Sequence, residues 1–488
     1  MQDLDRLDCL TVFWARDPHL NAYWQTSYGR LFDLVCSTQK RWAEYFRQQG
    51  TSNAAWLTWP GVSRPFVPWS ERLRDLTFVA RVKERPIRYF MCSFLQEQFG
   101  LEHDENLEWE AMLDRYSRAR IVPNEAILAE VNMRLFEGAS CGCVVVGQRT
   151  DEDIEELFEP GREALFFDHV LEMEEQIVWL LAHPAAAEKI GRRAWGRVQA
   201  CHLPLHRAQK LVELILGSGK IRRAPLQGEI DFWLTLHALF QAGALSFSSD
   251  ILKRRLAALK EQDPRVMAAF IQHLYTTQCC GELETALMYI SQSGFGAKSC
   301  LLYLTCSVAA LLGLKRLDLA RYFRQIHIRA EKQYRPVPDP ETGIELLLAW
   351  AALLQRQLFL HRPGFPFDAA RHLPQTALET LICAISLSAD PTRPVEQMQN
   401  LLRNAKGYDE FRLRHLSWLG LRRPKDWRLG LELGLTNLRV FRKQEGLEEL
   451  VAAFLAAHEQ GRDKAFFRVL DGEDLSGLVK RYLIKNDM

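Results

Sequence analysis

The chain has 488 residues, more than the roughly 100–200 residues of one domain, so we expect two or three domains. Hydrophobic residues make up 48% and charged residues 25%, and 62 Lys and Arg balance 61 Asp and Glu. This composition is typical of a globular protein and argues against a nucleic-acid partner or an anionic membrane surface. No apolar run reaches the roughly 20 residues of a transmembrane helix, and the first residues are not a signal peptide. We therefore expect a cytoplasmic protein without a transmembrane segment.

Strand and helix patterns alternate along the first part of the chain. The patterns before residue 70 are a strand at 10–15, a strand at 32–37, a helix at 38–50 and a strand at 54–61. A loop with Pro60, Pro65 and Pro68 follows, and such a loop suits a hinge between domains.

A second alternating series occupies residues 71–216. Its expected elements are a strand at 76–81, helices at 85–100 and 109–119, a strand at 120–124, a helix at 125–140, strands at 143–148 and 163–168, and helices at 171–183 and 185–202. Strands separated by helices of this length predict βαβ units and a parallel sheet. Two such series predict two Rossmann-like halves, at 1–70 and 71–216.

From residue 229 to residue 488 the strand patterns disappear and apolar residues recur at helical spacing. The stretch at 301–326 resembles a helical hairpin of the tetratricopeptide type, with small residues such as Ala309 and Gly313 where the helices would cross. We therefore predict an α/β part followed by an all-α helical-repeat domain at 229–488.

The 11 Cys residues do not indicate disulfides or a metal site. They are odd in number and include the adjacent Cys279 and Cys280, which favours reduced thiols. Cys141 and Cys143 have no partner pair of Cys or His at zinc-finger spacing, so we interpret both as small core residues. We expect no metal and no cofactor.

The stretch NMRLFEGASCGCVVVG, residues 132–147, combines polar side chains with small residues. We expect Asn132, Arg134 and Glu137 near the end of the helix at 125–140, with Arg134 and Glu137 on one face because they are three positions apart. A carboxylate can accept hydrogen bonds from paired ribose hydroxyls, and a guanidinium can bind a diphosphate. Small residues such as Gly142 would let a ligand approach the backbone closely. An ordinary amphipathic helix with an Arg–Glu pair at its edge is the alternative.

Residues 116–207 carry an ordered set of motifs around this stretch. The set consists of Asn124, Asn132, Arg134, Phe136, Glu137, Cys141, Gly142, Glu156, Leu157, Phe158, Gly161, His202 and Arg207. In this order it resembles the C-terminal domain of GT-B glycosyltransferases, most closely the group similar to the spore-maturation protein CgeB. Residues 32–50 resemble the last strand and helix of the family's N-terminal half. The first βαβ units of that half are absent, so we expect it to be truncated, either by a start codon placed too late or by loss of part of the acceptor domain.

The resemblance implies transfer of a sugar from a nucleotide-sugar to an unknown acceptor, without a required metal. By that analogy Glu137 would bind the ribose hydroxyls. Arg81 or Lys83, just after the second domain's first strand, and Arg134 would face the diphosphate, where fixed cations stabilise the charge of the leaving group. Glu130, seven positions before Glu137, would lie two turns back on the same helical face, near the sugar.

Asp17 and His19 follow the strand at 10–15, at the carboxyl end where α/β folds place their ligands. His19 could act as a base or donate to a sugar hydroxyl near neutral pH, so we predict Asp17 and His19 as catalytic residues. The alternative is a plain turn in which Asp17 precedes Pro18 and His19 is merely exposed.

Three functional hypotheses follow. The first is a GT-B-like glycosyltransferase whose helical domain recruits a protein or glycan acceptor. The second is a non-catalytic interaction or scaffold protein built on a degenerate GT-B core. The truncated N-terminal half favours this hypothesis, as does Ala80, which stands where the family usually has Gly. The third is another GT-B enzyme that uses sugar nucleotides, such as an epimerase.

Overall fold

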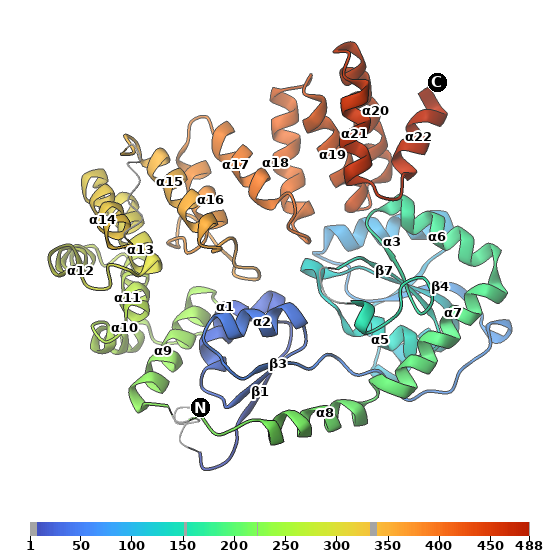
Figure 1. Cartoon of the computed structure of the whole chain (residues 1–488), viewed down its shortest axis with the longest axis horizontal. Helices are drawn as coiled ribbons and strands as arrows, with labels where there is room; N and C mark the ends of the chain where they lie inside the picture. Colours follow the sequence, from blue (N-terminus) through green and yellow to red (C-terminus); the bar gives the residue numbers. More distant parts are fainter. Residues whose placement is uncertain (1–6, 151–153, 222, 332–338, 488) are drawn as a thin grey trace. The chain divides into compact units, whose positions relative to one another are not determined.

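The computed structural model describes residues 7–150, 154–221, 223–331 and 339–487. The chain forms two compact units, each built from two separate segments, and Figure 1 labels their helices and strands. Unit 1 consists of Met1–Trp56 and Leu214–Leu401, and unit 2 consists of Leu57–Glu213 and Leu402–Met488. The expected domain ranges 1–70, 71–216 and 229–488 stay predictions.

Unit 1 begins with a small parallel sheet. Its strands, in spatial order, are β1 (Val12–Ala15), β2 (Leu34–Ser37) and β3 (Ala54–Trp56). Helix α1 (Pro18–Gly29) connects β1 to β2, and α2 (Lys40–Gln48) connects β2 to β3. Val35, Trp42 and Phe46 are buried together in this part, because the strand and the helix each turn an apolar face inward.

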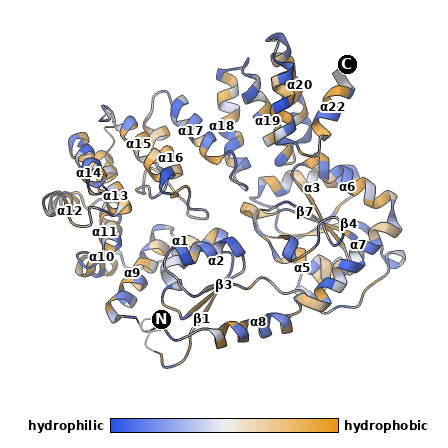
Figure 2. Cartoon of the chain, in the orientation of Figure 1, coloured by the Kyte–Doolittle hydropathy of each residue, from blue (hydrophilic) through white to orange (hydrophobic). Residues whose placement is uncertain are grey.

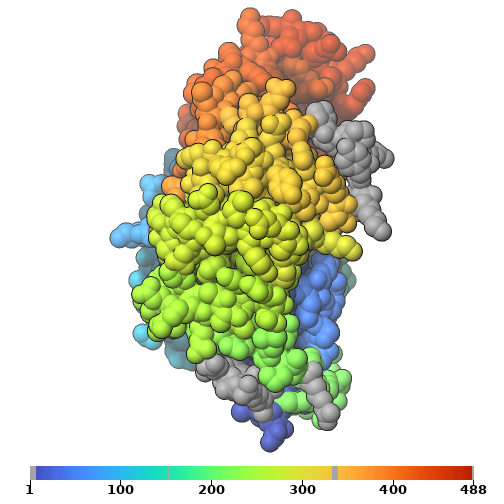
Figure 3. All heavy atoms as spheres, turned by 90° about the vertical axis from the view of Figure 1, so that its left-hand side faces the viewer, coloured from blue at the N-terminus to red at the C-terminus, as the bar shows by residue number. Residues whose placement is uncertain are grey.

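The rest of unit 1 is an array of helices, and several of them face the viewer in Figure 3. They are α9 (Pro225–Gln241), α10 (Ser249–Leu259), α11 (Pro264–Thr276), α12 (Cys280–Ser293), α13 (Cys300–Leu312), α14 (Leu317–Ala330), α15 (Gly343–Arg356), α16 (Ala377–Leu387) and α17 (Thr392–Leu402), which ends at the boundary with unit 2. Buried Asp231 of α9 accepts hydrogen bonds from Arg30, directly after α1, and from Arg265 of α11. This charged network joins the array to the small sheet.

Unit 2 contains a five-stranded parallel sheet. Its strands are β4 (Arg74–Val79), β5 (Glu102–Asp104), β6 (Ala119–Asn124), β7 (Val144–Gln148) and β8 (Leu165–Phe167). They lie in the order β5–β4–β6–β7–β8, and neighbouring strands are parallel. Val144, Val145 and Val146 of β7 are fully buried, as expected for a central parallel strand covered on both faces.

Both chain segments of unit 2 supply helices. The first segment gives α3 (Pro86–Phe99), α4 (Trp109–Ser117), α5 (Met133–Ser140), α6 (Val170–Ala182), α7 (Pro184–Arg197) and α8 (Pro204–Gly217), whose last turn passes into unit 1. The second segment gives α18 (Asp409–Arg422), α19 (Trp427–Arg439), α20 (Lys443–Glu459), α21 (Asp463–Glu473) and α22 (Leu478–Asp487). Helices α19 and α22 contact α6.

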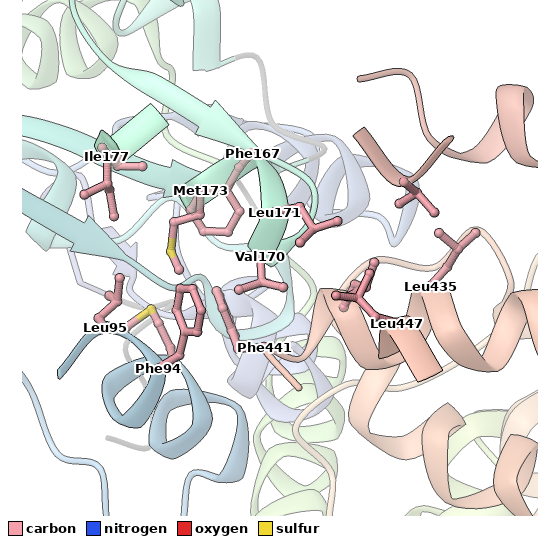
Figure 4. Close-up of a cluster of buried hydrophobic side chains, with 14 of the residues drawn as sticks. Phe94, Leu95, Phe167, Val170, Leu171, Met173, Ile177, Leu435, Phe441 and Leu447 are labelled. Carbon is pink, nitrogen blue, oxygen red and sulfur yellow. The ribbon is translucent and has the colours of Figure 1, made fainter. Parts of the chain in front are cut away.

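One hydrophobic core joins the two segments of unit 2, and Figure 4 shows part of it. Phe94 of α3, Phe167 of β8 and Val170 of α6 belong to the same cluster as Phe441, in the turn between α19 and α20, and Leu447 of α20. The rings of Phe167 and Phe441 lie 5.9 Å apart and are nearly perpendicular, a favourable edge-to-face contact. The C-terminal helices and the five-stranded sheet therefore share one hydrophobic core and form one folded unit.

Polar contacts fasten the same junction. Lys443 pairs with Glu174 of α6 at 2.7 Å. Nε2 of buried His169, at the start of α6, lies 3.3 Å from Oδ1 of Asp474, at the end of α21. Burial alone would raise the pKa of Asp474, but hydrogen bonds from His169, Ser476 and the Val479 backbone hold it at about 2. The Asp474 carboxylate is therefore charged at neutral pH, and it stays hydrogen-bonded to His169 at the start of α6.

The expected architecture of parallel α/β sheets followed by an all-helical region is confirmed. Figure 2 shows hydrophobic and hydrophilic residues alternating along the helices, as amphipathic helices require. Within the described residues, no helix is both long enough and apolar enough to span a bilayer.

Candidate functional site

The carboxyl ends of β4 and β6 form the candidate site. After β4 the chain adds β5 on one side, and it then returns to add β6 on the other side of β4. In doubly wound sheets such a reversal leaves a crevice outside the carboxyl ends of the two strands, where ligands bind. The segments that follow these strands, at 80–85 and 125–132, are therefore in position to carry functional groups.

The segment after β4 is rich in cations. Arg81, Lys83 and Arg85 are all exposed. Arg81 donates a hydrogen bond from Nε to Oδ1 of Asn106 at 3.3 Å. Lys83 has no polar partner among the described residues. The structure thus places Arg81 and Lys83 at the carboxyl end of β4, as the sequence predicts.

A buried ion pair links the segments after β4 and β6. Arg88 of α3 donates from Nη2 and Nε to one oxygen of Glu125, at 2.7 and 2.9 Å. Its Nη1 donates to the carbonyl oxygen of Arg81 at 2.9 Å. Because the two charges compensate each other, this pair fixes the backbone of the site and does not offer net charge to a ligand.

Arg134 offers a charge at the same edge. Its Nη1 donates to Oδ1 of Asn124, the last residue of β6, at 2.8 Å. The guanidinium carbon lies 4.4 Å from the centre of the Phe78 ring, which supports the cation through the negative face of the ring. Among the described residues Arg134 forms no ion pair, so a fixed positive charge is available there.

Glu137 lies one turn further along α5 on the same side. Its side chain is buried, with the residue 7% exposed, and within the described part of the chain its carboxylate accepts no hydrogen bond. Burial raises the pKa of Glu137 to about 7, and the charge of Arg134 opposes this rise. A buried carboxylate without a donor is costly, and strongly shifted groups of this kind concentrate at functional sites.

The helix expected at 125–140 is shorter than the sequence predicts. Leu128 and Ala129 adopt left-handed conformations, with φ of 48° and 58°, and α5 begins only at Met133. The expectation that Asn132, Arg134 and Glu137 lie near the end of a long helix is therefore wrong. Asn132 is the N-cap residue, and the other two lie in the first turns.

Two consequences follow from this shorter helix. Glu130 belongs to the loop before α5, so it cannot lie two turns back on the same helical face as Glu137. Asn132 donates from Nδ2 to the carbonyl oxygen of Glu125 at 3.1 Å, and its buried Oδ1 has no hydrogen-bond partner among the described residues. The amino end of α5, with its free N–H groups, therefore points toward the carboxyl edge of the sheet.

Gly142 is the predicted site residue that the structure does not bring to this edge. It precedes β7, at the amino ends of the strands, with φ of 72°. A Cβ at this position would lie 2.8 Å from Nη2 of Arg72 and from the ring of Phe66. Arg72 donates to the carbonyl oxygen of Cys141 at 2.7 Å. The small residue is thus required by a tight internal turn and not by the approach of a ligand.

Gly142→Ala is accordingly expected to destabilise unit 2 by about 2–4 kcal/mol, from the left-handed backbone and the overlap with Arg72 and Phe66. Chemical denaturation followed by circular dichroism measures the change. Gly161→Ala is the matched control, because Gly161 has a similar φ of 78° and open space around it; a loss of about 1–2 kcal/mol is expected there. Equal losses in the two variants would contradict the packing role of Gly142.

Asp17 and His19 lie in unit 1 at the carboxyl end of β1, where the sequence places them. Asp17 is the N-cap residue of α1, with φ of 47°, and burial raises its pKa. His19 is 1% exposed, so the alternative of an exposed histidine is wrong. Burial and the nearby charge of Arg41 lower the pKa of His19 to about 3. The ring is therefore neutral and a weak base, better suited to hydrogen bonding than to taking a proton.

Cys141 and Cys143 are fully buried, as predicted. Sequence reasoning missed the ion pair of Arg88 and Glu125. Glu125 directly follows the strand that ends at Asn124, a position that could have marked it, whereas nothing around Arg88 distinguishes it from other helical cations.

Residues 72–213 match a family model described as glycosyl transferase-like. The chain is similar to the pneumococcal O-GlcNAc transferase GtfA in complex with UDP and GlcNAc, at 13% identity over 40% of this chain and 47% of that chain, with a TM-score of 0.31. It is also similar to a GtfA/B complex, at 10% identity over 40% and 47%, with a TM-score of 0.29. The match spans about half the length of these two structures. No curated protein matches the chain significantly.

Proposed function

We propose that this protein is a GT-B glycosyltransferase, of the group similar to CgeB, and that unit 2 binds its nucleotide-sugar donor. The glycosyl transferase-like match of residues 72–213 supports sugar transfer in general. The observation that carries the proposal is the neighbouring pair of Arg134, a cation without an ion pair, and Glu137, a buried carboxylate without a hydrogen bond, considered among the described residues. A diphosphate and a ribose diol offer the complementary groups.

In the proposed reaction the bond between the anomeric carbon and the diphosphate oxygen breaks. The acceptor hydroxyl bonds to that carbon and releases its proton to solvent water, and the nucleoside diphosphate leaves with the electron pair of the broken bond and one additional negative charge. Arg134, together with Arg81 and Lys83 on the segment after β4, would stabilise that charge as it develops. Because these cations take the place of a bound ion, the proposed mechanism needs no metal, and EDTA should leave the activity unchanged.

The acceptor side is assigned to unit 1. Neutral His19 at the carboxyl end of β1 would hold an acceptor hydroxyl by a hydrogen bond, with Asp17 nearby. The helical array of α9–α17, proposed here as a tetratricopeptide-like region, would recruit the protein or glycan that carries this hydroxyl.

The second candidate is a non-catalytic interaction protein that binds a sugar nucleotide without transferring the sugar. The pKa of His19, lowered to about 3, favours it because such a group is a poor general base at neutral pH. Nucleotide binding with no release of sugar, to water or to any acceptor, would select this candidate.

The test of donor binding is a thermal-shift and calorimetric screen with UDP, GDP, ADP and CDP. At least one of them should stabilise the protein, by about 2.7 kcal/mol at a ligand concentration 100 times its Kd. The matching nucleoside and inorganic pyrophosphate are the controls, and each should bind more weakly, because each fills only one part of the site. Absence of binding by all four nucleotides would contradict the proposal.

A further inference from the structure

A loop of the C-terminal segment reaches the candidate site. Residues 403–408 connect α17 to α18 and belong to unit 2. Nζ of Lys406 lies 3.4 Å from the carbonyl oxygen of Arg149, directly after β7. Gly407 faces Leu128, in the loop between β6 and α5. The C-terminal loop thus contacts the segments that follow two neighbouring strands at their carboxyl ends.

The contact at Gly407 is made by backbone. A Cβ on Gly407 would lie 2.3 Å from Cα of Leu128 and 2.9 Å from its carbonyl carbon. Real Cβ atoms essentially never come that close to backbone, so only glycine fits at this position. The φ of Gly407 is 83°, a conformation that also favours glycine.

The partner of this contact is the strained turn at Leu128 and Ala129. Two consecutive residues that are not glycine adopt positive φ there. Such conformations persist only where the surrounding structure holds them, and they concentrate at functional sites. Gly407 supplies a close-packed surface against the first of the two residues.

The two ends of the loop at 125–132 are held by hydrogen bonds within the sheet region. At its start, the N–H of Ala126 donates to Oε1 of Gln148 in β7 at 3.0 Å. At its end, Asn132 donates to the carbonyl oxygen of Glu125, so the loop closes on itself next to Arg134. In the middle of the loop, Leu128 is in close contact with Gly407 of the C-terminal segment.

We propose that Gly407 is a positioning residue of the nucleotide site, and that the C-terminal loop at 403–408 holds the loop at 125–132 in its binding conformation. The proposal rests on the proposed function of unit 2. It makes donor affinity depend on a segment that lies outside the region 72–213. By thermodynamic reciprocity, a nucleotide bound at the site must also steady the C-terminal loop.

The experiment compares Gly407→Ala with Gly461→Ala in the full chain. Gly461 also has a positive φ, 65°, and a Cβ at that position would have nothing within 4 Å. Both variants place an alanine at a positive φ, which destabilises the fold by a similar amount in each. Only in Gly407→Ala does the added Cβ overlap the backbone of Leu128. Hydrogen exchange of residues 125–132 in the free protein is expected to be at least tenfold faster in Gly407→Ala and unchanged in Gly461→Ala. The affinity for the stabilising nucleotide should fall at least tenfold in the first variant only.

The outcomes separate the two proposals. Exchange and affinity that are equal in the two variants would overturn the positioning role, even if the wild type binds a nucleotide. Failure of the wild type to bind any nucleoside diphosphate would overturn the proposed function, while the exchange measurement still decides whether Gly407 holds the loop. If Gly407→Ala does not fold, hydrogen exchange of the wild type with and without nucleotide tests the inference instead. Bound nucleotide should slow exchange at 403–408 and not at 460–462, and unchanged exchange at 403–408 would overturn the inference.

Discussion

Deletion of residues 402–488 is expected to unfold the sheet of unit 2 together with the helices removed. The deleted helices share one core with Phe94, Phe167 and Val170, and Phe441 packs edge-to-face on Phe167. Each large apolar side chain that returns to water costs about 1.5–3 kcal/mol. Half a dozen such losses are on the order of the 5–15 kcal/mol that stabilises a whole domain. The truncated chain should lack near-UV circular dichroism from this unit and should bind a dye specific for exposed apolar surface.

A milder pair of substitutions tests the same core without removing chain. Phe441→Ala should lower the free energy of unfolding of unit 2 by about 3–5 kcal/mol. Leu475→Ala is the control, because Leu475 is 87% exposed and should change stability by less than about 0.5 kcal/mol. A chain ending at Leu401 that keeps a cooperative unfolding transition for residues 57–213 would contradict the shared core.

Arg134→Ala and Glu137→Gln are each expected to weaken nucleotide binding about 10- to 100-fold, since charge-assisted hydrogen bonds are worth about 1.5–3 kcal/mol. Arg134→Ala should lose affinity for inorganic pyrophosphate, and Glu137→Gln should lose affinity for the nucleoside. Titration calorimetry gives both values. Arg162→Ala is the control, because Arg162 is exposed and pairs only with Glu159 among the described residues; wild-type affinity is expected for it.

The same carboxylate gives binding a defined pH dependence. The pKa of Glu137 is raised from 4.5 to about 7 in the free protein, so the folded state holds this proton more tightly than the unfolded chain. The free protein therefore loses stability as the pH rises from 4.5 to about 7. Ribose hydroxyls need the ionised form, so affinity should rise about tenfold between pH 6 and pH 8, with release of a proton.

Glu137→Gln separates this effect from titration of the nucleotide itself. Any pH dependence that persists in this variant belongs to the phosphate groups or to other residues. Equal pH profiles for the wild type and Glu137→Gln would show that Glu137 does not bind in its ionised form, and the assignment to the ribose would be wrong.

Strands β1, β2 and β7 could be predicted because the information that specifies them is local. The apolar runs at 10–15, 32–37 and 143–148 contain β1, β2 and β7, and polar turns mark their ends. The presence of Asp17 at the carboxyl end of β1 follows from the same local pattern. The candidate site residues Arg81, Arg134 and Glu137 were predicted from the resemblance to GT-B glycosyltransferases, because the local pattern alone also fits an ordinary amphipathic helix.

The break in the helix at 125–140 could not be predicted because the contact that accompanies it joins residues distant in sequence. The residues EAILAEV favour a helix by composition, yet Leu128 is packed against Gly407 and takes a positive φ. The role of Gly142 was missed for a similar reason, because the overlap with Arg72 appears only when the chain is folded. Amphipathic helices after residue 402 show an apolar face, but the sequence does not say that this face covers α3 and α6.

The discontinuous build of unit 2 has a consequence for synthesis on the ribosome. The sheet at 57–213 emerges first, but the helices that complete its core come after residues 214–401. At about 5–20 residues per second, the nascent chain waits roughly 10–40 s for them. During that interval the C-terminal helices do not cover Phe94, Phe167 and Val170. The nascent chain therefore exposes an apolar surface that other proteins can bind. Chaperone demand and aggregation in expression should therefore track the translation rate of the middle of the message.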